Sequence, residues 1–191
     1  MEKEIITMSY AGFLMGDKVY LRPMNVEDVD WYYQNLHEPE MRRWTGTKRH
    51  FTKEFIAAYL ERKGQDDSSV LLAIVRREDD RPIGDIALQD IDPSNRCCNI
   101  RVAINQTADT GKGYGSEAMK LMLDYGFGVL GLHRIELNVF DYNGRAMHVY
   151  EKLGFKREGV QREALFYDHA YHDSILMSIL EDEFRAIHVR R

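Results

Sequence analysis

The chain has 191 residues, of which 44% are hydrophobic and 30% charged, and a formal net charge of -5. This length and mixture predict one soluble globular domain over residues 1–191, and the mildly acidic balance argues against a nucleic-acid partner, which needs a basic surface. No run reaches the roughly 18 consecutive apolar residues of a membrane span, and the acidic start of the chain does not resemble a secretory signal. We therefore expect neither a nucleic-acid partner nor a membrane partner.

The two cysteines, Cys97 and Cys98, are neighbours in the chain. On a strand their side chains would point to opposite faces, so they are poor disulfide partners. Two cysteines are also too few for a zinc site without histidines at ligand spacing, and the histidines show no such spacing. We predict no metal site and a reducing, cytoplasmic location.

Hydrophobic periodicity and turn residues predict the elements in chain order. Residues 1–16 have no clear period and are expected to form an N-terminal arm. Asn25 and Thr52 are suited to cap the first two helices, and Gly131 and Gly154 are suited to end the last two. The predicted strands are residues 18–22, 70–77, 83–91, 99–104, 134–140, 161–167 and 171–180, and the predicted helices are residues 26–36, 53–63, 116–130 and 145–153.

The order of these elements decides the fold class. Several predicted strands follow one another directly, which excludes a regular alternation of strand and helix. The fold class is therefore α+β (mixed α/β), with a largely antiparallel sheet of about seven strands and helices on both faces.

A glycine-rich loop lies between the predicted strand at 99–104 and the predicted helix at 116–130. It reads Thr110-Gly111-Lys112-Gly113-Tyr114-Gly115-Ser116. Glycines let the backbone approach a ligand closely and adopt positive φ, and the start of a helix adds free N–H groups with a partial positive charge. Together these features predict an anion site suited to a pyrophosphate.

Three alternative interpretations apply to a loop of this kind. A nucleoside-triphosphate loop needs G-x-x-x-x-G-K-[ST], and no window of the chain fits. Residues 113–118 match the dinucleotide pattern G-x-G-x-x-A, with Glu136 at a distance suited to a ribose contact, but the loop is far from its strand and few elements follow it. A turn that only joins strand to helix is the third interpretation.

A second motif favours the anion site over these alternatives, of which the dinucleotide enzyme stays open. It reads Asn138-Val139-Phe140-Asp141-Tyr142-Asn143, then Ala146, then Tyr150-Glu151-Lys152-Leu153-Gly154-Phe155. With the loop, the stretch 99–155 resembles the GNAT acetyltransferases, and the closest branch resembles the ribosomal-protein N-terminal acetyltransferases and the spermidine acetyltransferases. The family's loop pattern is Q/R-x-x-G-x-G/A, and Thr110 stands where Gln or Arg is usual. The departure is mild, because that position contributes mainly main-chain groups.

The resemblance implies an acetyl-CoA cofactor and a V-shaped cleft where the strand at 136–140 splays away from the strand at 99–104. The amides of the glycine loop would hold the pyrophosphate, and the backbone of the strand before the loop would pair with the pantetheine arm. The expected cofactor contacts are Val102, Ala103, Ile104, Thr110, Gly111, Lys112, Gly113, Tyr114, Gly115, Ser116, Asn138, Asn143 and Tyr150.

The reaction needs a neutral amine, a donor for the developing oxyanion and a hydrogen bond or proton for the leaving thiolate. By the resemblance, Tyr150 is the expected acid; the alternative is that it only packs against or orients the cofactor. The general base is open. Some relatives carry a glutamate where this chain has Asn99. The candidates for the base are therefore a water chain or the carboxylate of Asp85. In the alternative interpretation Asp85 is only a solvent-facing strand residue.

The acceptor pocket is expected between the first two helices and their connection, where aromatic and acidic residues suit a cationic amine. In the alternative interpretation the aromatics are core and the charges are solvated. A peptide N-terminus, a polyamine and an amine-bearing antibiotic are the competing acceptors. An acetyl-CoA sensor without turnover is the alternative function, and relatives suggest a homo-oligomer. The candidate acceptor residues are Trp31, Tyr33, Glu38, Glu40 and Trp44.

Overall fold

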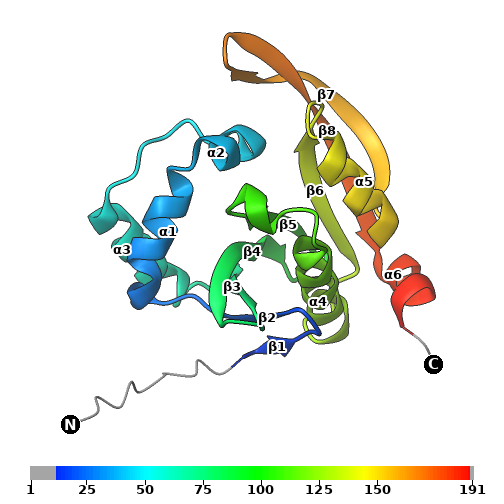
Figure 1. Ribbon diagram of the computed structural model, residues 1–191. Helices are drawn as coiled ribbons and strands as arrows, with labels where there is room; N and C mark the ends of the chain where they lie inside the picture. Colours follow the sequence, from blue (N-terminus) through cyan, green and yellow to red (C-terminus); the bar gives the residue numbers. More distant parts are fainter. Residues whose placement is uncertain (1–11, 190–191) are drawn as a thin grey trace.

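The computed structural model describes residues 12–189. One sheet of eight strands, in the order β1-β2-β3-β4-β5-β6-β8-β7, has helices on both faces (Figure 1). Among the strands of residues 12–189 only β5 and β6 pair in parallel, so the predicted α+β class with a largely antiparallel sheet is confirmed. The strands are β1 (Leu14–Met15), β2 (Val19–Pro23), β3 (Val70–Arg76), β4 (Arg81–Asp92), β5 (Cys97–Ile104), β6 (Arg134–Phe140), β7 (Lys156–Tyr167) and β8 (Ala170–Leu180).

The predicted caps fix where the first helices begin. The side chain of Asn25 accepts a hydrogen bond from the amide of Glu27, and that of Thr52 accepts one from the amide of Phe55. Such caps satisfy amides that have no partner inside the helix. The helices are α1 (Val29–Leu36), α2 (Pro39–Thr45), α3 (Lys53–Lys63), α4 (Tyr114–Gly128), α5 (Gly144–Leu153) and α6 (Glu181–His188), with the 3-10 turns η1 (Val26–Asp28) and η2 (Thr107–Asp109).

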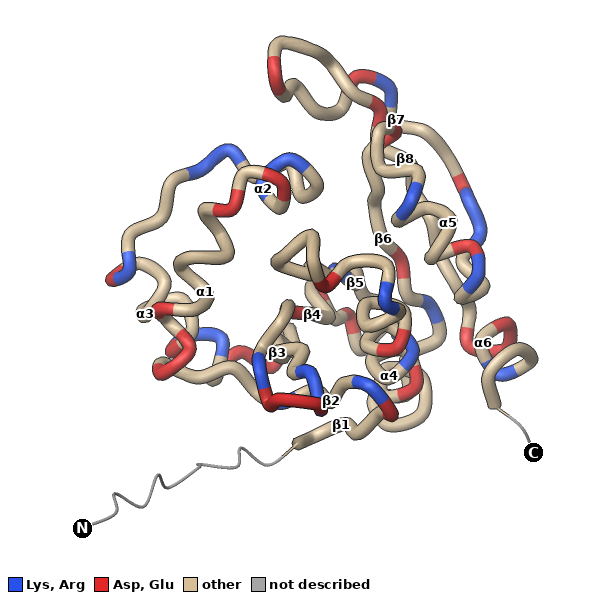
Figure 2. Tube along the Cα trace, in the orientation of Figure 1, with Lys and Arg blue, Asp and Glu red and all other residues tan. Residues whose placement is uncertain are grey.

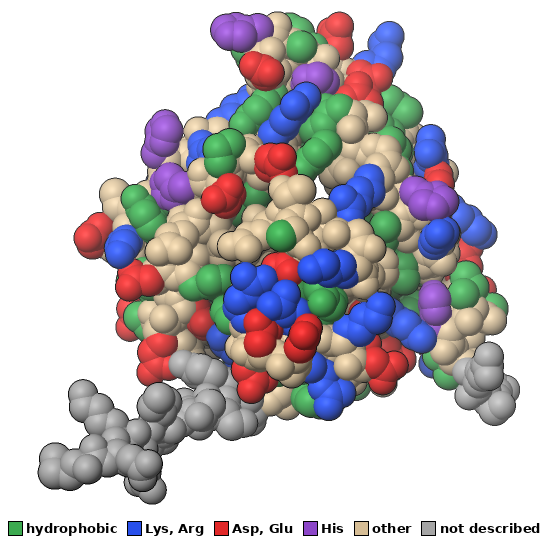
Figure 3. All heavy atoms as spheres, viewed as in Figure 1, with side chains coloured by type: hydrophobic (Ala, Val, Ile, Leu, Met, Phe, Trp, Pro, Cys, Tyr) green, Lys and Arg blue, Asp and Glu red, His purple; other side chains and the backbone are tan. Residues whose placement is uncertain are grey.

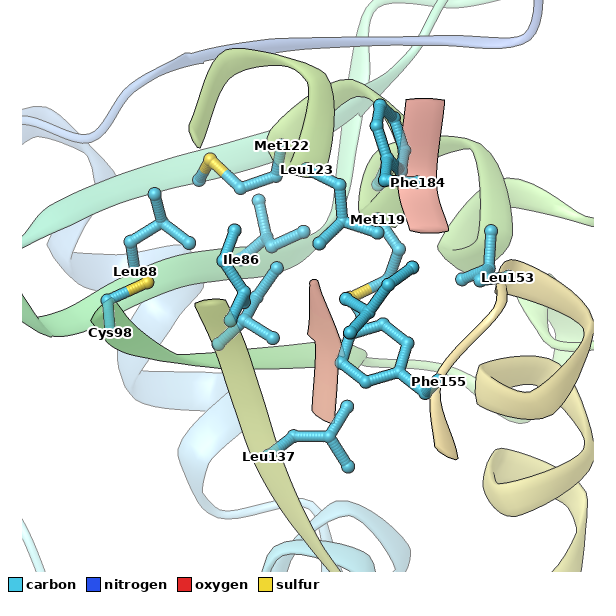
Figure 4. Packing of buried hydrophobic residues seen from close by; sticks show 14 of the residues in the cluster. Ile86, Leu88, Cys98, Met119, Met122, Leu123, Leu137, Leu153, Phe155 and Phe184 are labelled. Carbon is cyan, nitrogen blue, oxygen red and sulfur yellow. The ribbon is translucent and has the colours of Figure 1, made fainter. Parts of the chain in front are cut away.

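Two hydrophobic clusters hold these layers together. The larger lies between the sheet and helices α4, α5 and α6, where Met119 and Leu123 of α4 pack near Ile86 of β4 and Phe184 of α6 (Figure 4). The smaller joins β2 and β3 to α1 and α3 through residues such as Tyr32 and Ile56. Full burial of one large apolar side chain stabilises a fold by about 1.5–3 kcal/mol, so the sheet is fixed from both faces.

Strands β5 and β6 separate part of the way along their length. They pair only at Cys97 with Arg134, Cys98 with Ile135 and Asn99 with Glu136. Beyond that point the rest of β5 pairs only with β4, and the rest of β6 pairs only with β8. The predicted splaying of these strands is therefore confirmed, and the second edge of β5 has no strand beside it after Asn99.

Some expectations about the elements were wrong. The sheet has eight strands because Leu14–Met15 pairs with β2, a segment too short to show a pattern; the rest of the predicted arm, residues 1–11, lies outside the described residues. Helices α2 and α6 were not predicted. β7 begins at Lys156 rather than at residue 161. The sequence does not reveal its first half, because the residues there alternate poorly and the pairing with β8 is bulged.

No helix within residues 12–189 is both long enough and apolar enough to cross a membrane.

Candidate active site

The glycine loop has the backbone geometry that an anion site requires. Gly111 has φ of +80° and Gly113 has φ of +87°, a region that side chains with a Cβ rarely adopt. The backbone hydrogen bonding of α4 begins with the amide of Glu117, which donates to the carbonyl of Gly113. The amides of Tyr114, Gly115 and Ser116 therefore have no partner within the helix and are available to a ligand.

Two cationic side chains from outside this loop contact it. Lys18 donates to the carbonyl of Lys112 at 3.1 Å, and Arg145 donates to the hydroxyl of Thr110 at 3.0 Å. A Cβ on Gly111 would lie 3.0 Å from the guanidinium of Arg145, so glycine keeps the loop and this cation in contact. Figure 2 shows basic positions both in the loop before α4 and on α5. A diphosphate fits this combination of free amides and positive charge.

Lys18 and Arg145 were missed by sequence analysis. Lys18 reaches the loop because Glu117 of α4 accepts hydrogen bonds from the amides of Asp17 and Lys18, at 2.5 and 3.0 Å. Figure 3 shows the resulting mixture of basic and acidic side chains over β1, β2 and the start of α4. The only sequence signal for Arg145 was its place in the first turn after the Asn143 cap.

The segment before the loop is fixed by a buried carboxylate. Asp109 is 2% exposed and forms ion pairs with Arg76 of β3 and Arg81 of β4. The hydroxyl of Thr107 donates to Glu40 of α2. The loop is thus tied to the sheet below it and to α2, which keeps its amides in place.

Tyr150 lies on α5, partly buried against the larger cluster, with its ring centroid 5.9 Å from that of Phe155. No hydrogen bond to its hydroxyl comes from the described residues. Burial raises the pKa of Tyr150 to about 12. The phenol therefore stays protonated at neutral pH and can donate a hydrogen bond.

The two predicted asparagines have different surroundings. Asn143 caps α5, where its Oδ1 accepts from the amide of Ala146 at 3.2 Å, and this leaves the two N–H groups of Nδ2 for another partner. Asn138 lies on the face of β6 away from α4 and α5, where Nδ2 donates to Ser174 of β8 at 3.1 Å. The structure brings Asn143 to the glycine-loop side and Asn138 to the opposite face.

Asp85 is not a solvent-facing residue. It is 1% exposed, and its carboxylate lies 2.6 Å from the guanidinium of Arg101 on the neighbouring strand. Burial raises the pKa of Asp85, and Arg101 opposes that shift. Arg101 also donates to the hydroxyl of Tyr32 on α1 at 3.2 Å. This placement gives Asp85 a role in a buried ion pair, and its predicted role as a base stays an untested prediction.

Helix α2 bridges the ends of the two separated strands. Its first turn contacts Thr107, which follows β5, through Glu40. Its last turn contacts Tyr142, which follows β6: the hydroxyl of Tyr142 donates to the carbonyl of Arg43 at 2.6 Å, and the Trp44 ring lies 5.9 Å away. In Figure 1, α2 accordingly lies above β5 and beside β6. Glu40 and Trp44 therefore border the opening, and their role in binding an acceptor stays a prediction.

The remaining acceptor candidates do not all reach this opening. Trp31 stacks on Tyr32 and packs against the smaller cluster. Tyr33 contacts His37 and the ammonium of Lys53. Glu38 is an exposed residue at the start of α2. For Trp31 and Tyr33 the alternative interpretation, that aromatics support the packing of the helices, fits their contacts.

Comparison with known proteins now decides the family. Residues 18–156 match the model of the acetyltransferase (GNAT) domain. The chain belongs to the GNAT acetyltransferase family. It is 31% identical to spermidine N(1)-acetyltransferase of Escherichia coli (strain K12) over 175 residues, which cover 89% of this chain and 90% of that protein. It is also 31% identical to the probable N-acetyltransferase YjcK of Bacillus subtilis (strain 168), covering 89% of this chain and 98% of that one.

Solved structures agree with the fold of this acetyltransferase. The spermidine N-acetyltransferase of Vibrio cholerae in complex with CoA and spermine aligns with a TM-score of 0.83 at 23% identity, covering 88% of this chain and 99% of that one. This GNAT chain is an acetyl-CoA-dependent N-acetyltransferase that acts on an amine. A dinucleotide enzyme and a sensor without turnover are not favoured by these relatives.

Proposed function

We propose that acetyl-CoA lies along the free edge of β5 with its pyrophosphate at the start of α4, and that a primary amine meets it from the face that carries α1 and α2. The observation that carries this proposal is the separation of β5 from β6 after Asn99, with the glycine loop on one side and α2 across the other. When bound, the cofactor supplies an acetyl group activated as a thioester.

The chain's own residues have three tasks on the cofactor side. The amides of Tyr114, Gly115 and Ser116 hold the diphosphate, as they have no partner within α4. The backbone of residues 102–104 lines the free edge of β5, and one of its N–H groups is suited to the oxyanion. Asn143 offers the cofactor the two N–H groups of its Nδ2, which the cap of α5 does not use.

Tyr150 then acts as a hydrogen-bond donor to the leaving sulfur rather than as a full acid. Its pKa is about 12, whereas an ordinary thiol has a pKa of about 8.5. Complete proton transfer to the thiolate would cost about 5 kcal/mol, while a hydrogen bond to a charged acceptor contributes about 1.5–3 kcal/mol.

A polyamine is the first candidate acceptor, because two of the relatives above are named for spermidine. On this chain, Glu40 and the rings of Trp44 and Tyr142 border the opening, and carboxylates and aromatic faces attract ammonium groups. A Vibrio cholerae spermidine N-acetyltransferase is dodecameric, which supports self-association here; light scattering after gel filtration tests it. The cytoplasmic location belongs to the same proposal.

A second candidate acceptor is the N-terminus of an acidic peptide. The end of α2 and the segment that follows it are basic: Arg43, Lys48 and Arg49 are exposed, and none of them forms an ion pair with a carboxylate in the described part of the chain. Multiple positive charges beside the opening repel a polyamine and attract an acidic chain.

Thiol release from acetyl-CoA decides between these acceptors. The panel contains spermidine and spermine, peptides with acidic or neutral residues after the N-terminus, and amine-bearing antibiotics, with product mass as confirmation. Turnover with one class identifies the acceptor. If acetyl-CoA raises the melting temperature but no amine releases thiol, the proposed catalysis is wrong and a sensor of acetyl-CoA is favoured. If acetyl-CoA does not bind, the whole proposal fails.

A further inference from the structure

The point where β5 and β6 separate carries a carboxylate to which sequence analysis gave no part in acetyl transfer. The last paired residues are Asn99 and Glu136, so these two side chains lie next to each other at the start of the opening. The neighbours Ile135 and Leu137 belong to the larger cluster under α4 and α5. Side chains alternate along a strand, so Glu136 points to the opposite face, from which we expect the amine to arrive.

The contacts of Glu136 leave half of its carboxylate uncommitted. Arg134 donates to Oε2 twice, from Nε at 3.1 Å and from Nη2 at 2.8 Å. No hydrogen bond from the described residues reaches Oε1. The side chain of Glu136 is 38% exposed, whereas that of Arg134 is 27% exposed. The carboxylate is therefore held in one orientation and still presents an acceptor oxygen to a ligand.

Other carboxylates on the strands of this face are occupied or distant. Asp85 is paired with Arg101 and buried. Glu158 of β7 uses both oxygens, since Arg134 binds both and Ser178 donates to one. Asp141 lies past the far end of β6, where it accepts from the amide of Asp173 and faces His172.

We propose that Glu136 is the catalytic residue that accepts the proton of the acceptor amine, directly or through one water. The amine nitrogen forms its bond to the acetyl carbon as the C–S bond breaks, and its proton passes to Oε1 of Glu136. The electron pair of the broken bond stays on sulfur, where the hydroxyl of Tyr150 donates a hydrogen bond. Glu136 then returns the proton to solvent, so the step needs no further reactant.

This assignment rests on the proposed function, and one matched pair of variants tests it. Glu136→Gln keeps the shape of the side chain and removes the proton acceptor. Glu158→Gln removes the other carboxylate that pairs with Arg134, in what we call the Arg134 cluster (Arg134, Glu136 and Glu158). Glu158 lies on β7, away from the point where β5 and β6 separate. Melting-temperature shifts with acetyl-CoA check that both variants fold and bind the cofactor.

With an amine that the wild type acetylates, we expect Glu136→Gln to lower kcat/KM by about 100-fold or more, the range for loss of a general base, and Glu158→Gln to change it less than about twofold. We also expect the pH profile of Glu136→Gln to rise until the amine itself loses its proton, since only neutral amine then reacts. Arg134 on β6 pairs with Glu136 and with Glu158 of β7, and on β5 the next charged residue after Asn99 is Arg101, which is bound to Asp85; all of these groups remain in this variant.

The outcomes separate the two claims. If the wild type acetylates an amine and Glu136→Gln matches its rate and pH profile, the assignment of Glu136 is overturned and the proposed function stands. If both glutamines lower kcat/KM equally, the Arg134 cluster acts only structurally and the assignment is again overturned. If the wild type acetylates no amine, the proposed function fails and the assignment fails with it.

Discussion

On the side of α4 and α5, the opening between β5 and β6 is bordered by one continuous loop and the start of one helix, whereas on the side of α1 and α2 it is bordered by residues from many separate elements. The glycine loop takes its shape from its own sequence, through positive φ at Gly111 and Gly113. The other side depends on pairs such as Arg101 with Asp85 and Arg43 with Tyr142, which form only when the chain has folded.

This difference separates binding of a fixed cofactor from recognition of a variable acceptor. A local motif can bind the same diphosphate wherever it occurs, because amides and a helix start are all that it needs. A surface assembled from distant elements can change one residue at a time without disturbing that motif. Variants of the glycine loop should therefore change cofactor affinity, whereas variants on the side of α1 and α2 should change stability and acceptor kinetics.

The largest expected effect is on stability and comes from Asp85→Asn. The variant leaves the charge of Arg101 without its carboxylate in a site where Asp85 is 1% exposed. Breaking a buried pair costs about 3–5 kcal/mol, and because Arg101 is 32% exposed we expect the lower end, about 3 kcal/mol of unfolding free energy. Urea unfolding measures it. The double variant with Arg101→Gln should recover part of the loss; a loss below about 1 kcal/mol in the single variant would show that the pair is open to water.

The next effect is on catalysis and comes from Tyr150→Phe. Loss of a hydrogen bond to a charged sulfur should lower kcat about 30-fold, which corresponds to about 2 kcal/mol, with little change in acetyl-CoA affinity. Because the pKa of Tyr150 is raised to about 12, its ionisation should not lower the wild-type rate below about pH 11. Steady-state kinetics with one amine across pH tests both statements. A wild-type rate in the variant would leave Tyr150 only a packing role.

The sequence predicts the cofactor side better than the acceptor side for a physical reason. The glycine loop and the splayed strands follow from local patterns and from the family resemblance. Helix α2 does not: it has seven residues with one buried apolar side chain, Met41, so it shows no hydrophobic period. It is stabilised by Thr107 and Tyr142, which lie far away in the chain.

The same limit applies to charged residues of the site. Asp85 was a reasonable candidate base in the sequence, but only the pairing of β4 with β5 reveals that Arg101 binds it. Glu136 was considered only for a ribose contact, because its position opposite Asn99 depends on strand register. Lys18 and Arg145 reach the glycine loop from other elements. Residue type and spacing predict which groups exist, and tertiary pairing decides which remain available.

A smaller effect is expected on cofactor affinity from Gly113→Ala. The φ of +87° disfavours any side chain by about 1–2 kcal/mol, so the loop should shift and bind acetyl-CoA about tenfold more weakly. Gly128→Ala is the control, since a Cβ there meets nothing within 4 Å. Calorimetric titration with acetyl-CoA compares the two. Equal affinity in Gly113→Ala would mean that the loop amides contribute little, and the division between the two sides would lose its main support.

The smallest expected effect tests the charge cluster beneath the acceptor side. Hydrogen bonds from Arg134 and then Ser178 lower the pKa of Glu158 to about 2. A carboxylate whose pKa is lowered in the folded state stabilises the fold above about pH 4.5, and this contribution is lost as pH falls toward 2. The side chain is 36% exposed, so solvent screening reduces the contribution to about 1 kcal/mol.

Glu158→Gln should therefore lower the unfolding free energy by about 1 kcal/mol at pH 7 and by much less near pH 2.5. Glu163→Gln, on the same strand, is the control, because its carboxylate forms no ion pair within the described residues. If Glu158→Gln and the wild type lose stability in parallel as pH falls, the Arg134–Glu158 pair is open in solution. Among the described residues Arg134 would then keep its hydrogen bonds to Glu136 and Ser178, and the Glu136 carboxylate would be less firmly oriented.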